Sequence, residues 1–382
     1  FNGGETLNLT AKFAYEFQLG SGAVQGLNSL ELGLGADLIY PRVIFFIPIK
    51  ERFSYSAPKT KMSVGTEFLD RQGLFRLNTI SGNYGYFWNA NRFVYHEINP
   101  ISINLVNPTR ISDTFEEILN SNPFLRTSFE RQFIVGMNYT FNFNKLADQF
   151  RTHGFYAGLG IDLAGNALNA AGNVIGSESG EFLGLPYAQY AKADVDLRYY
   201  LRLSESQTIA TRFVAGVGKP LGRSVALPYI KQFFAGGPNS IRAFRIRSLG
   251  PGTYRPEEFN QESFYDQAGD IRLEGNIEYR FPIVSVLKGA AFLDAGNIWL
   301  MNENEKLPGG KFTSSWWDEL AVGTGLGLRV DIQFFVIRFD LAVPIRIPYL
   351  PEGERWVTNF ELGSSDWRRE NLIFNFAIGY PF

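Results

Sequence analysis

Hydrophobic and polar residues alternate along most of the chain, with a period of two residues. In residues 5–18 the odd positions are apolar and the even positions mostly polar: Leu7, Leu9, Ala11, Phe13, Tyr15 and Phe17 against Thr6, Asn8, Thr10, Lys12, Ala14 and Glu16. The alternation recurs in residues 30–38, 133–143, 155–163, 194–203 and 271–281. Because successive side chains of a β-strand point to opposite faces, the pattern predicts strands with one apolar and one polar face.

These predicted strands are long for a soluble protein. Strands of soluble sandwiches average about five or six residues, whereas a tilted strand that crosses a bilayer needs about nine to eleven. The polar faces carry charges of both signs and the apolar faces almost none. The combination indicates an all-β protein, a transmembrane antiparallel β-barrel with lipid outside and water inside. A soluble all-β barrel is the alternative, and the segment lengths disfavour it.

The connections between the predicted strands alternate in length. Short turns are expected near residues 89–91, 204–206 and 331–333, and long connections at 166–185, 219–269, 300–318 and 344–370. Bacterial outer-membrane barrels have short periplasmic turns and long extracellular loops, so both termini are expected in the periplasm. About fourteen strands follow from the pattern, and one further pair within 41–61 or after Asn144 would give the even total of 16 that we expect.

The longest connection, residues 219–269 (the long loop), has an unusual composition. Gly236 and Gly237 favour a sharp turn, because glycine tolerates positive φ. Ile241, Arg242 and Phe244 then place one cation between two large apolar side chains. A loop built for solvent would not mix its arginines with Phe and Ile, so we expect this extracellular loop to fold into the lumen.

Two smaller expectations concern other loops. Residues 111–126 carry a helical signal, with Asp113 and Glu116 at the spacing of a capping box. The loop carboxylates Glu257, Glu258 and Asp266 lack metal-ligand spacing and are expected to be solvated.

Composition and charge exclude several classes of function. Aromatic residues make up 15% of the chain and charged residues 19%, which suits an apolar outer surface. A net charge of -2 argues against nucleic-acid binding, for which a basic excess is expected. Cysteine is absent, and the two histidines, His96 and His153, flank no Ser–Asp arrangement. We therefore expect no enzymatic activity, metal or cofactor. Gly323, Gly325 and Gly327 imitate a nucleotide fingerprint, but they would line one face of a strand.

Several ordered motifs resemble the BamA/TamA superfamily of outer-membrane assembly and translocation barrels. They are GGPNSIRAF at 236–244, GNIEYRFPI at 275–283, FLDAGNIW at 292–299, GLGLRVDIQFFVIRFDLAVPI at 325–345 and LIFNFAIGYPF at 372–382, which resembles an outer-membrane β-signal. FNGGETL at 1–7, and Ala243 in place of the usual Gly, are most similar to the TamL proteins of Bacteroidetes. A BamA-type core assembly barrel is the alternative. The resemblance implies one barrel domain over residues 1–382, preceded in the full protein by periplasmic POTRA domains.

The resemblance also implies a function, the assembly, insertion or translocation of proteins at the outer membrane. It would act through a lateral seam between the first strand, expected at 5–18, and the last, expected at 371–382; seam residues are Leu7, Leu9, Phe13, Phe374, Phe376, Gly379 and Phe382. The expected partners are the lipid bilayer, unfolded outer-membrane or surface proteins, a TamB-like periplasm-spanning protein and accessory assembly subunits. A passive porin is the alternative.

The resemblance gives the loop arginine a partner as well. In members of the superfamily the arginine of this motif meets an acidic cluster on the inner wall. Glu278 and Asp294 stand at the matching positions here, and the period of two turns both inward. We therefore expect Arg242 to pair with them.

Overall fold

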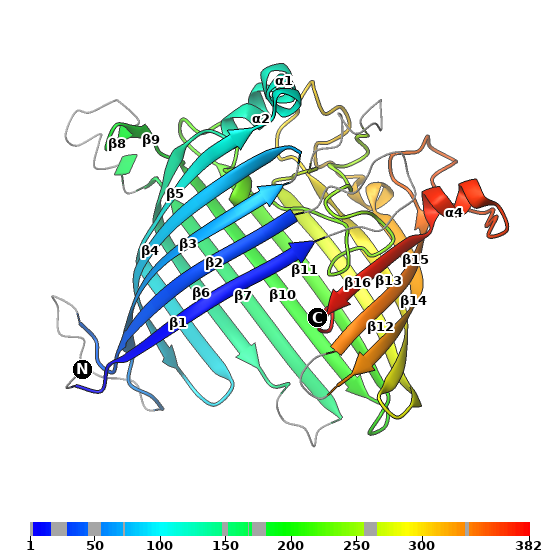
Figure 1. Cartoon of the computed structure of the whole chain (residues 1–382), viewed down its shortest axis with the longest axis horizontal. Helices are drawn as coiled ribbons and strands as arrows, with labels where there is room; N and C mark the ends of the chain where they lie inside the picture. The colour runs from blue at the N-terminus through cyan, green and yellow to red at the C-terminus, as the bar shows by residue number, and fades with distance from the viewer. Residues whose placement is uncertain are drawn as a thin grey trace.

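In the computed structural model of the chain, the described residues are 3–16, 29–44, 55–71, 73–146, 152–166, 168–169, 181–255, 266–332 and 336–382. They confirm an all-β barrel, in which one antiparallel sheet of 14 strands follows the order of the chain (Figure 1). Its strands are β1 (Thr6–Glu16), β2 (Ser29–Tyr40), β3 (Lys59–Arg71), β4 (Phe75–Asn89), β5 (Val94–Ile111), β6 (Gln132–Asn144), β7 (His153–Ala164), β10 (Tyr190–Arg202), β11 (Thr208–Pro220), β12 (Ile271–Val284), β13 (Leu287–Trp299), β14 (Ala321–Asp331), β15 (Val336–Arg346) and β16 (Ile373–Ile378).

The remaining elements are short and lie in the connections. They are α1 (Asp113–Ser121), α2 (Pro123–Ser128), α4 (Ser365–Asn371), the 3-10 helices η1 (Tyr229–Lys231) and η2 (Trp316–Glu319), and a small hairpin of β8 (Glu181–Phe182) and β9 (Leu185–Pro186). Figure 1 shows α1 and α2 over one end of the barrel. In the part of the chain that the structure describes, no helix is long and apolar enough to span a membrane.

The described sheet has two strands fewer than the 16 expected. The first candidate position for another pair, residues 41–61, lies between β2 and β3, which pair directly with each other. The second, after Asn144, lies between β6 and β7, which also pair directly. Residues 45–54 and 147–151 of these connections lie outside the described residues. Neither position therefore adds a strand to the described sheet.

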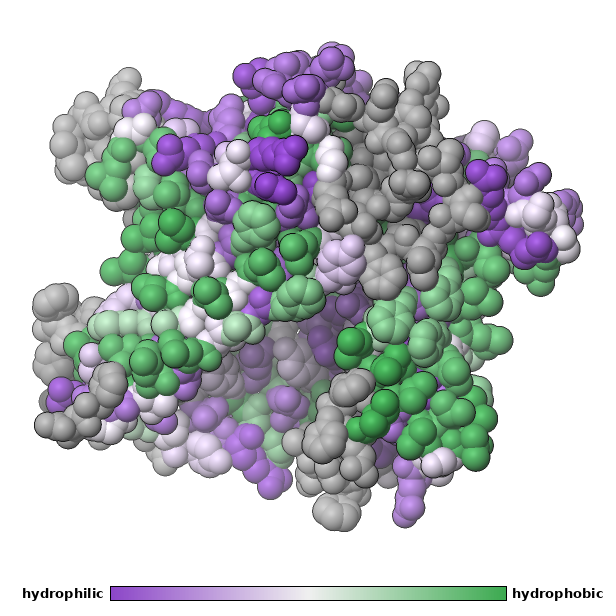
Figure 2. All heavy atoms as spheres, in the orientation of Figure 1, coloured by the Kyte–Doolittle hydropathy of each residue, from purple (hydrophilic) through white to green (hydrophobic). Residues whose placement is uncertain are grey.

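The two faces of the sheet follow the alternation in the sequence. Apolar residues are exposed on the outer face of strand after strand, including Leu9, Phe13, Leu34, Val64, Ile80, Phe155, Phe213, Ile277, Leu326 and Phe376. Figure 2 shows apolar side chains over much of the wall on both sides of the opening between β1 and β16. Polar residues gather at the end of the barrel that carries α1. An exposed apolar band of this kind suits a wall that faces lipid.

The last strand differs from the prediction at both of its ends. The last strand was expected at 371–382, but Asn371 ends α4 and β16 stops at Ile378. Gly379 has a φ of 93°, and beyond it the carbonyl of Phe382 accepts a hydrogen bond at 3.2 Å from Arg280 on β12. The chain end therefore turns into the barrel, because a left-handed residue cannot continue a strand.

The first helix also begins differently. Its N-cap is Ser112, whose hydroxyl accepts from the amide of Phe115 at 3.2 Å, rather than Asp113. Ser112 has the extended backbone that an N-cap requires, while Asp113 and Glu116 lie within the first turn, where their charges favour the helix dipole.

The edges formed by β1 and β16 face each other across the front of the barrel in Figure 1. Every other pair of neighbouring strands is joined by an antiparallel ladder, but within the described residues no ladder joins β1 to β16. The ladder between β15 and β16 spans Ile337–Ala342 of β15, whereas that between β1 and β2 runs along all of β1. Among the described strands, the sheet is thus open between β1 and β16.

Candidate functional site

The loop tip, residues 236–244, begins with a turn that only glycine fits. Gly236 and Gly237 have φ values of 99° and 97°. The amide of Gly237 donates to the carbonyl of Phe244 at 2.9 Å, which closes the tip. A Cβ on Gly236 would lie 2.2 Å from the carbonyl oxygen of Arg245, so the chain returns too closely for any side chain.

Arg242 lies inside the barrel against two acidic residues of the wall. Its Nε and Nη2 donate to Asp294 of β13, each at 2.8 Å, and its backbone amide donates to the same carboxylate at 3.1 Å. Its Nη1 bonds Glu278 of β12. Glu278 and Asp294 are fully buried, and Arg242 nearly so. The structure thus brings together the three residues that sequence reasoning had paired, in a two-carboxylate geometry that suits guanidinium and not ammonium.

Apolar contacts complete the seat of the tip. The guanidinium carbon of Arg242 lies 3.5 Å from the ring centroid of Phe292, a cation–π contact. Ile241, Ala243 and Phe244 are buried in a cluster with residues of β13, β14 and β15, including Ile298, Ala321 and Ala342. The tip is therefore held by both charge and packing.

Several residues at the site were not singled out from the sequence. Asp340 of β15 lies 3.9 Å from Arg242, and Arg329 of β14 bridges Glu278 and Asp340 at 3.2 and 2.5 Å. Arg338 donates to Asn239 of the loop at 2.6 Å. Glu278, Asp294 and Asp340 together form what we call the acidic cluster. Their inward positions follow the period of two, but that period alone does not say which inward charges meet.

The tip also contacts the last strand. The side-chain amide of Asn375 on β16 donates to the backbone carbonyl of Arg242 at 2.9 Å. Glu278, the partner of Arg242, accepts a further bond at 2.8 Å from Arg280, which also holds the carbonyl of Phe382. The acidic cluster therefore contacts the tip directly and is linked through Arg280 to the chain end at one edge of the opening.

The other predicted seam residues stand at the two edges, apart from this cluster. Leu7, Leu9 and Phe13 are exposed on the outer face of β1. Phe374 and Phe376 are exposed on the outer face of β16. Phe339 of β15 contacts the rings of Phe374 and Phe376.

Asp266 is not solvated, contrary to the expectation from the sequence. It is buried and paired with Arg71 of β3 at 2.6 Å and with Arg247 of the loop at 3.0 Å. Burial raises the pKa of Asp266, but Arg71, Arg247 and the hydroxyl of Tyr229 outweigh it and lower the pKa below its ordinary value. These partners are far from Asp266 in sequence or in irregular segments, which is why no pattern indicated them. Glu257 and Glu258 lie outside the described residues.

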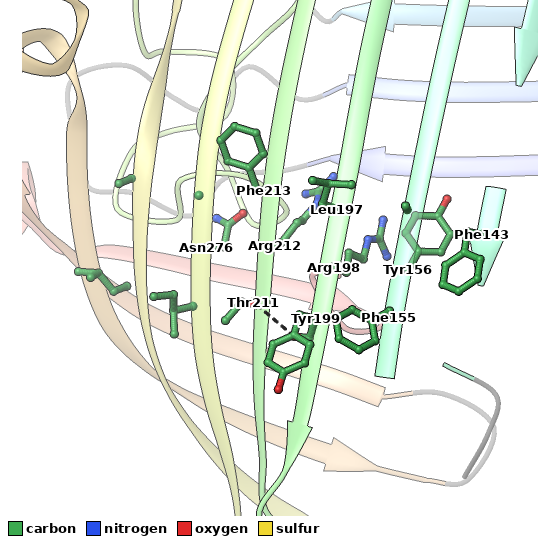
Figure 3. Close-up of a pocket in the computed structure, with 15 residues that line it drawn as sticks. Phe143, Phe155, Tyr156, Leu197, Arg198, Tyr199, Thr211, Arg212, Phe213 and Asn276 are labelled. Carbon is green, nitrogen blue, oxygen red and sulfur yellow. Dashed lines mark hydrogen bonds between the residues drawn. The ribbon is translucent and has the colours of Figure 1, made fainter. Parts of the chain in front are cut away.

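One hollow at the barrel wall is not part of this site. It measures about 700 Å³ and lies among Phe155, Leu197, Phe213 and Ile277, which are exposed on the outer face. Figure 3 shows Tyr199, Phe155 and Phe213 around it, while Arg198 and Arg212 come from the same strands. Gly275, where a Cβ would meet nothing within 4 Å, leaves room there. The hollow belongs to the apolar outer wall.

The chemistry of the site is that of an anchor for the loop. In the described part of the chain, no group of three or more His, Asp or Glu side chains could hold a metal ion. The arrangement can hold the loop tip against the inner wall, because oppositely charged groups interact strongly when they are buried together.

Comparison with known proteins identifies the family of this barrel. A model of the Omp85 superfamily domain matches residues 73–382. The outer membrane protein assembly factor BamA of Neisseria meningitidis serogroup B is 23% identical over 196 residues, which are 46% of this chain and 24% of that protein. The chain thus matches about a quarter of the length of that curated relative.

One solved structure supports the same fold. BamA from Haemophilus ducreyi lacking POTRA domains 1-3 aligns with a TM-score of 0.62 and 14% identity, over 99% of this chain and 70% of that chain. CdiB from Acinetobacter baumannii aligns with a TM-score of 0.49 and 12% identity, over 92% and 52%. The resemblance to the BamA/TamA superfamily is confirmed, and the likeness to TamL stays a prediction. Because the domain model matches most of its length, the chain belongs to the Omp85 superfamily.

Proposed function

We propose that the chain is the barrel of a factor that assembles, inserts or translocates proteins at the bacterial outer membrane, and that it acts through a lateral seam between β1 and β16. Omp85 barrels such as BamA lie in that membrane, and the Neisseria relative is an outer membrane protein assembly factor. The observation that carries the proposal is the edge between β1 and β16, the only neighbours in the described sheet without a ladder.

An open sheet edge leaves backbone groups unpaired. In hydrocarbon no water can satisfy the amides and carbonyls of an open edge, and each unsatisfied group costs several kcal/mol. An open edge therefore favours pairing with another strand, as in β-augmentation. The 11 residues of β1 offer such an edge, and the exposed apolar side chains of Leu9 and Phe13 stand beside it. An unfolded client strand could pair there while its apolar side chains enter lipid.

The remaining parts of the proposal concern the whole protein. The clients are unfolded outer-membrane or surface proteins, both termini are periplasmic, and POTRA domains precede the barrel in the full protein. A TamB-like periplasm-spanning protein or accessory assembly subunits are the proposed partners. The proposed role is non-enzymatic. Ala243, in place of the usual Gly, supports a TamL-type member.

A cysteine tether tests the seam directly, because residues 1–382 contain no cysteine. Leu9→Cys with Phe376→Cys, in the full-length protein in lipid vesicles, should block insertion of an unfolded client barrel when oxidised and restore it when reduced. The control pair is Leu7→Cys with Leu38→Cys, which are cross-strand partners within the β1–β2 ladder. Unchanged insertion with a quantitatively oxidised 9–376 pair would refute the seam.

A passive porin makes the opposite electrical prediction. The tip of the long loop lies inside the barrel beside the acidic cluster, so we expect small, flickering currents across a planar bilayer. A large, steady conductance would favour the porin instead.

A further inference from the structure

The long loop has a second buried contact, at the far end from its tip. Asp266 precedes β12 by a few residues, and its Oδ1 accepts from Nη2 of Arg71, the last residue of β3, at 2.6 Å. Its Oδ2 accepts from Nη1 of Arg247 at 3.0 Å and from the hydroxyl of Tyr229. The side chains of Arg71 and Asp266 are exposed by only 2% and 1%. One carboxylate thus joins a barrel strand to two other points of the loop.

This contact crosses the barrel. In the order of the 14-stranded sheet β3 is third and β12 is tenth, so they stand seven places apart, half of the circumference. The loop leaves the wall at β11 and returns at β12, yet Asp266 is paired with β3 on the opposite side. By contrast, Arg242 pairs with β12 and β13, the wall to which the loop is already attached.

Aromatic packing supports the same crossing. Tyr229 of the loop lies 5.3 Å from Phe75 of β4 and 4.6 Å from Phe129, measured between ring centroids. Phe115 of α1 contacts both phenylalanines. All four rings are buried in one cluster. The ion pairs of Asp266 therefore lie beside a dry apolar cluster, where charge pairs are weakly screened.

We infer that Asp266 is a positioning residue that ties the long loop to β3 across the lumen and so limits how far the two sides of the seam can separate. The inference rests on the proposed function. The strands β1 to β3 stand on one side of the seam, and β12 to β16 on the other. The loop is bound to the first side through Asp266 and to the second through Arg242 and Asn375. Separation of the two sides must stretch or break one of these contacts.

Distance measurements across the seam test this. Nitroxide labels at positions 9 and 376, both exposed on the outer face, report the seam width by pulsed electron resonance in lipid nanodiscs. Asp266→Asn keeps the shape of the side chain and removes its charge, and should increase the population of long distances at least threefold. Asp266→Glu retains a carboxylate and should return that population most of the way to the parent value. A purely structural loss would not be rescued in this way.

A matched control breaks an ion pair of the same loop that does not cross the lumen. Lys231 pairs with Asp162 of β7 at 2.6 Å, and β7 stands only two places from β11. Lys231→Gln should leave the seam distances unchanged. If Asp266→Asn does not fold, Tyr229→Phe removes one bond to the same carboxylate and should shift the distances in the same direction, to a smaller extent.

Two results would overturn the inference: distances in Asp266→Asn equal to those of the parent, or an equal shift in Lys231→Gln. The readout uses no client protein. Failure of the client-insertion experiment with an intact distance response would therefore reject the proposed function alone.

Discussion

Gly323 of β14 and Ala243 of the loop tip are in such close contact that a Cβ at position 323 would lie 2.2 Å from the Cβ of Ala243. Gly323 is also the cross-strand partner of Asp294, which binds Arg242. The small residue on the wall therefore gives the tip room to reach the acidic cluster. This explains Gly323 by its packing against the tip, and no phosphate-binding role is needed.

The first prediction follows from this contact. Gly323→Ala should displace the tip, because the overlap falls on a well-packed segment, and overpacking of this kind costs about 1–3 kcal/mol. Protease access within residues 238–246 and ion conductance should both rise. Gly82→Ala is the control, since a Cβ there would meet nothing within 4 Å. A variant at Gly323 that is as protected and as closed as the parent would show that the tip tolerates the overlap.

The second prediction concerns Arg242. Arg242→Ala leaves the buried carboxylate of Asp294 without a cation, while Glu278 keeps Arg280 and Arg329, at a local cost of about 3–5 kcal/mol. The tip should be released, with greater protease access within 238–246 and higher conductance. Arg242→Lys keeps the charge but loses the fork, so it should give an intermediate result. If the alanine variant stays closed and protected, the packing of Ile241 and Phe244 holds the tip without the arginine.

The third prediction is a pH dependence from Asp270, which lies just before β12. Its Oδ2 accepts from the amide of Met301 at 3.0 Å, and its Oδ1 has no partner among the described residues. Burial raises the pKa of Asp270 from 3.8 to about 6. Between these two pKa values Asp270 is protonated in the folded protein but ionised in the unfolded chain. The free energy of unfolding therefore falls as pH rises from about 4 to 6. Over the whole range, Asp270 lowers the free energy of unfolding by about 3 kcal/mol.

Asp270→Asn removes the ionisable group, so this variant tests the pH dependence. Unfolding by urea in lipid vesicles should show a shallower loss of stability between pH 4 and 6 for Asp270→Asn than for the parent. The other carboxylates contribute to both proteins, so the difference between the two curves isolates Asp270. Parallel curves would mean that this carboxylate does not carry the raised pKa.

The sequence predicted the strands of the wall well, and the irregular segments poorly, for a physical reason. A strand between lipid and water must alternate, so Leu9 and Phe13 indicate their face from the sequence alone. The inward positions of Glu278 and Asp294 follow from the same period. Asp266 and Arg71, by contrast, are 195 residues apart, and Asp266 lies outside any strand, so no period joins them. Their contact depends on how the loop crosses the lumen.

The predicted end of the last strand was wrong for a related reason. The alternation in LIFNFAIGYPF continues to the final Phe, but the positive φ of Gly379 turns the chain inward after Ile378. Glycine permits that conformation without requiring it. The contact of Phe382 with Arg280 selects it, and this contact is visible only once β12 and β16 are placed.

The last prediction separates the tip from the seam strand. Asn375→Leu removes the hydrogen bond to the carbonyl of Arg242, while the ion pairs of Arg242 with Asp294 and Glu278 remain. The loss is about 1 kcal/mol, so the tip should stay in place and β16 alone should loosen. Hydrogen exchange should therefore quicken several-fold in 373–378 and remain unchanged in 238–246. The control is Asn276→Leu, because Asn276 is also buried but donates to Ser240 of the loop and to Asp294. It should quicken exchange in the tip and leave β16 as it was. If both variants loosen both segments, the tip and the last strand form one cooperative unit, and Asn375 is not a separate link between them.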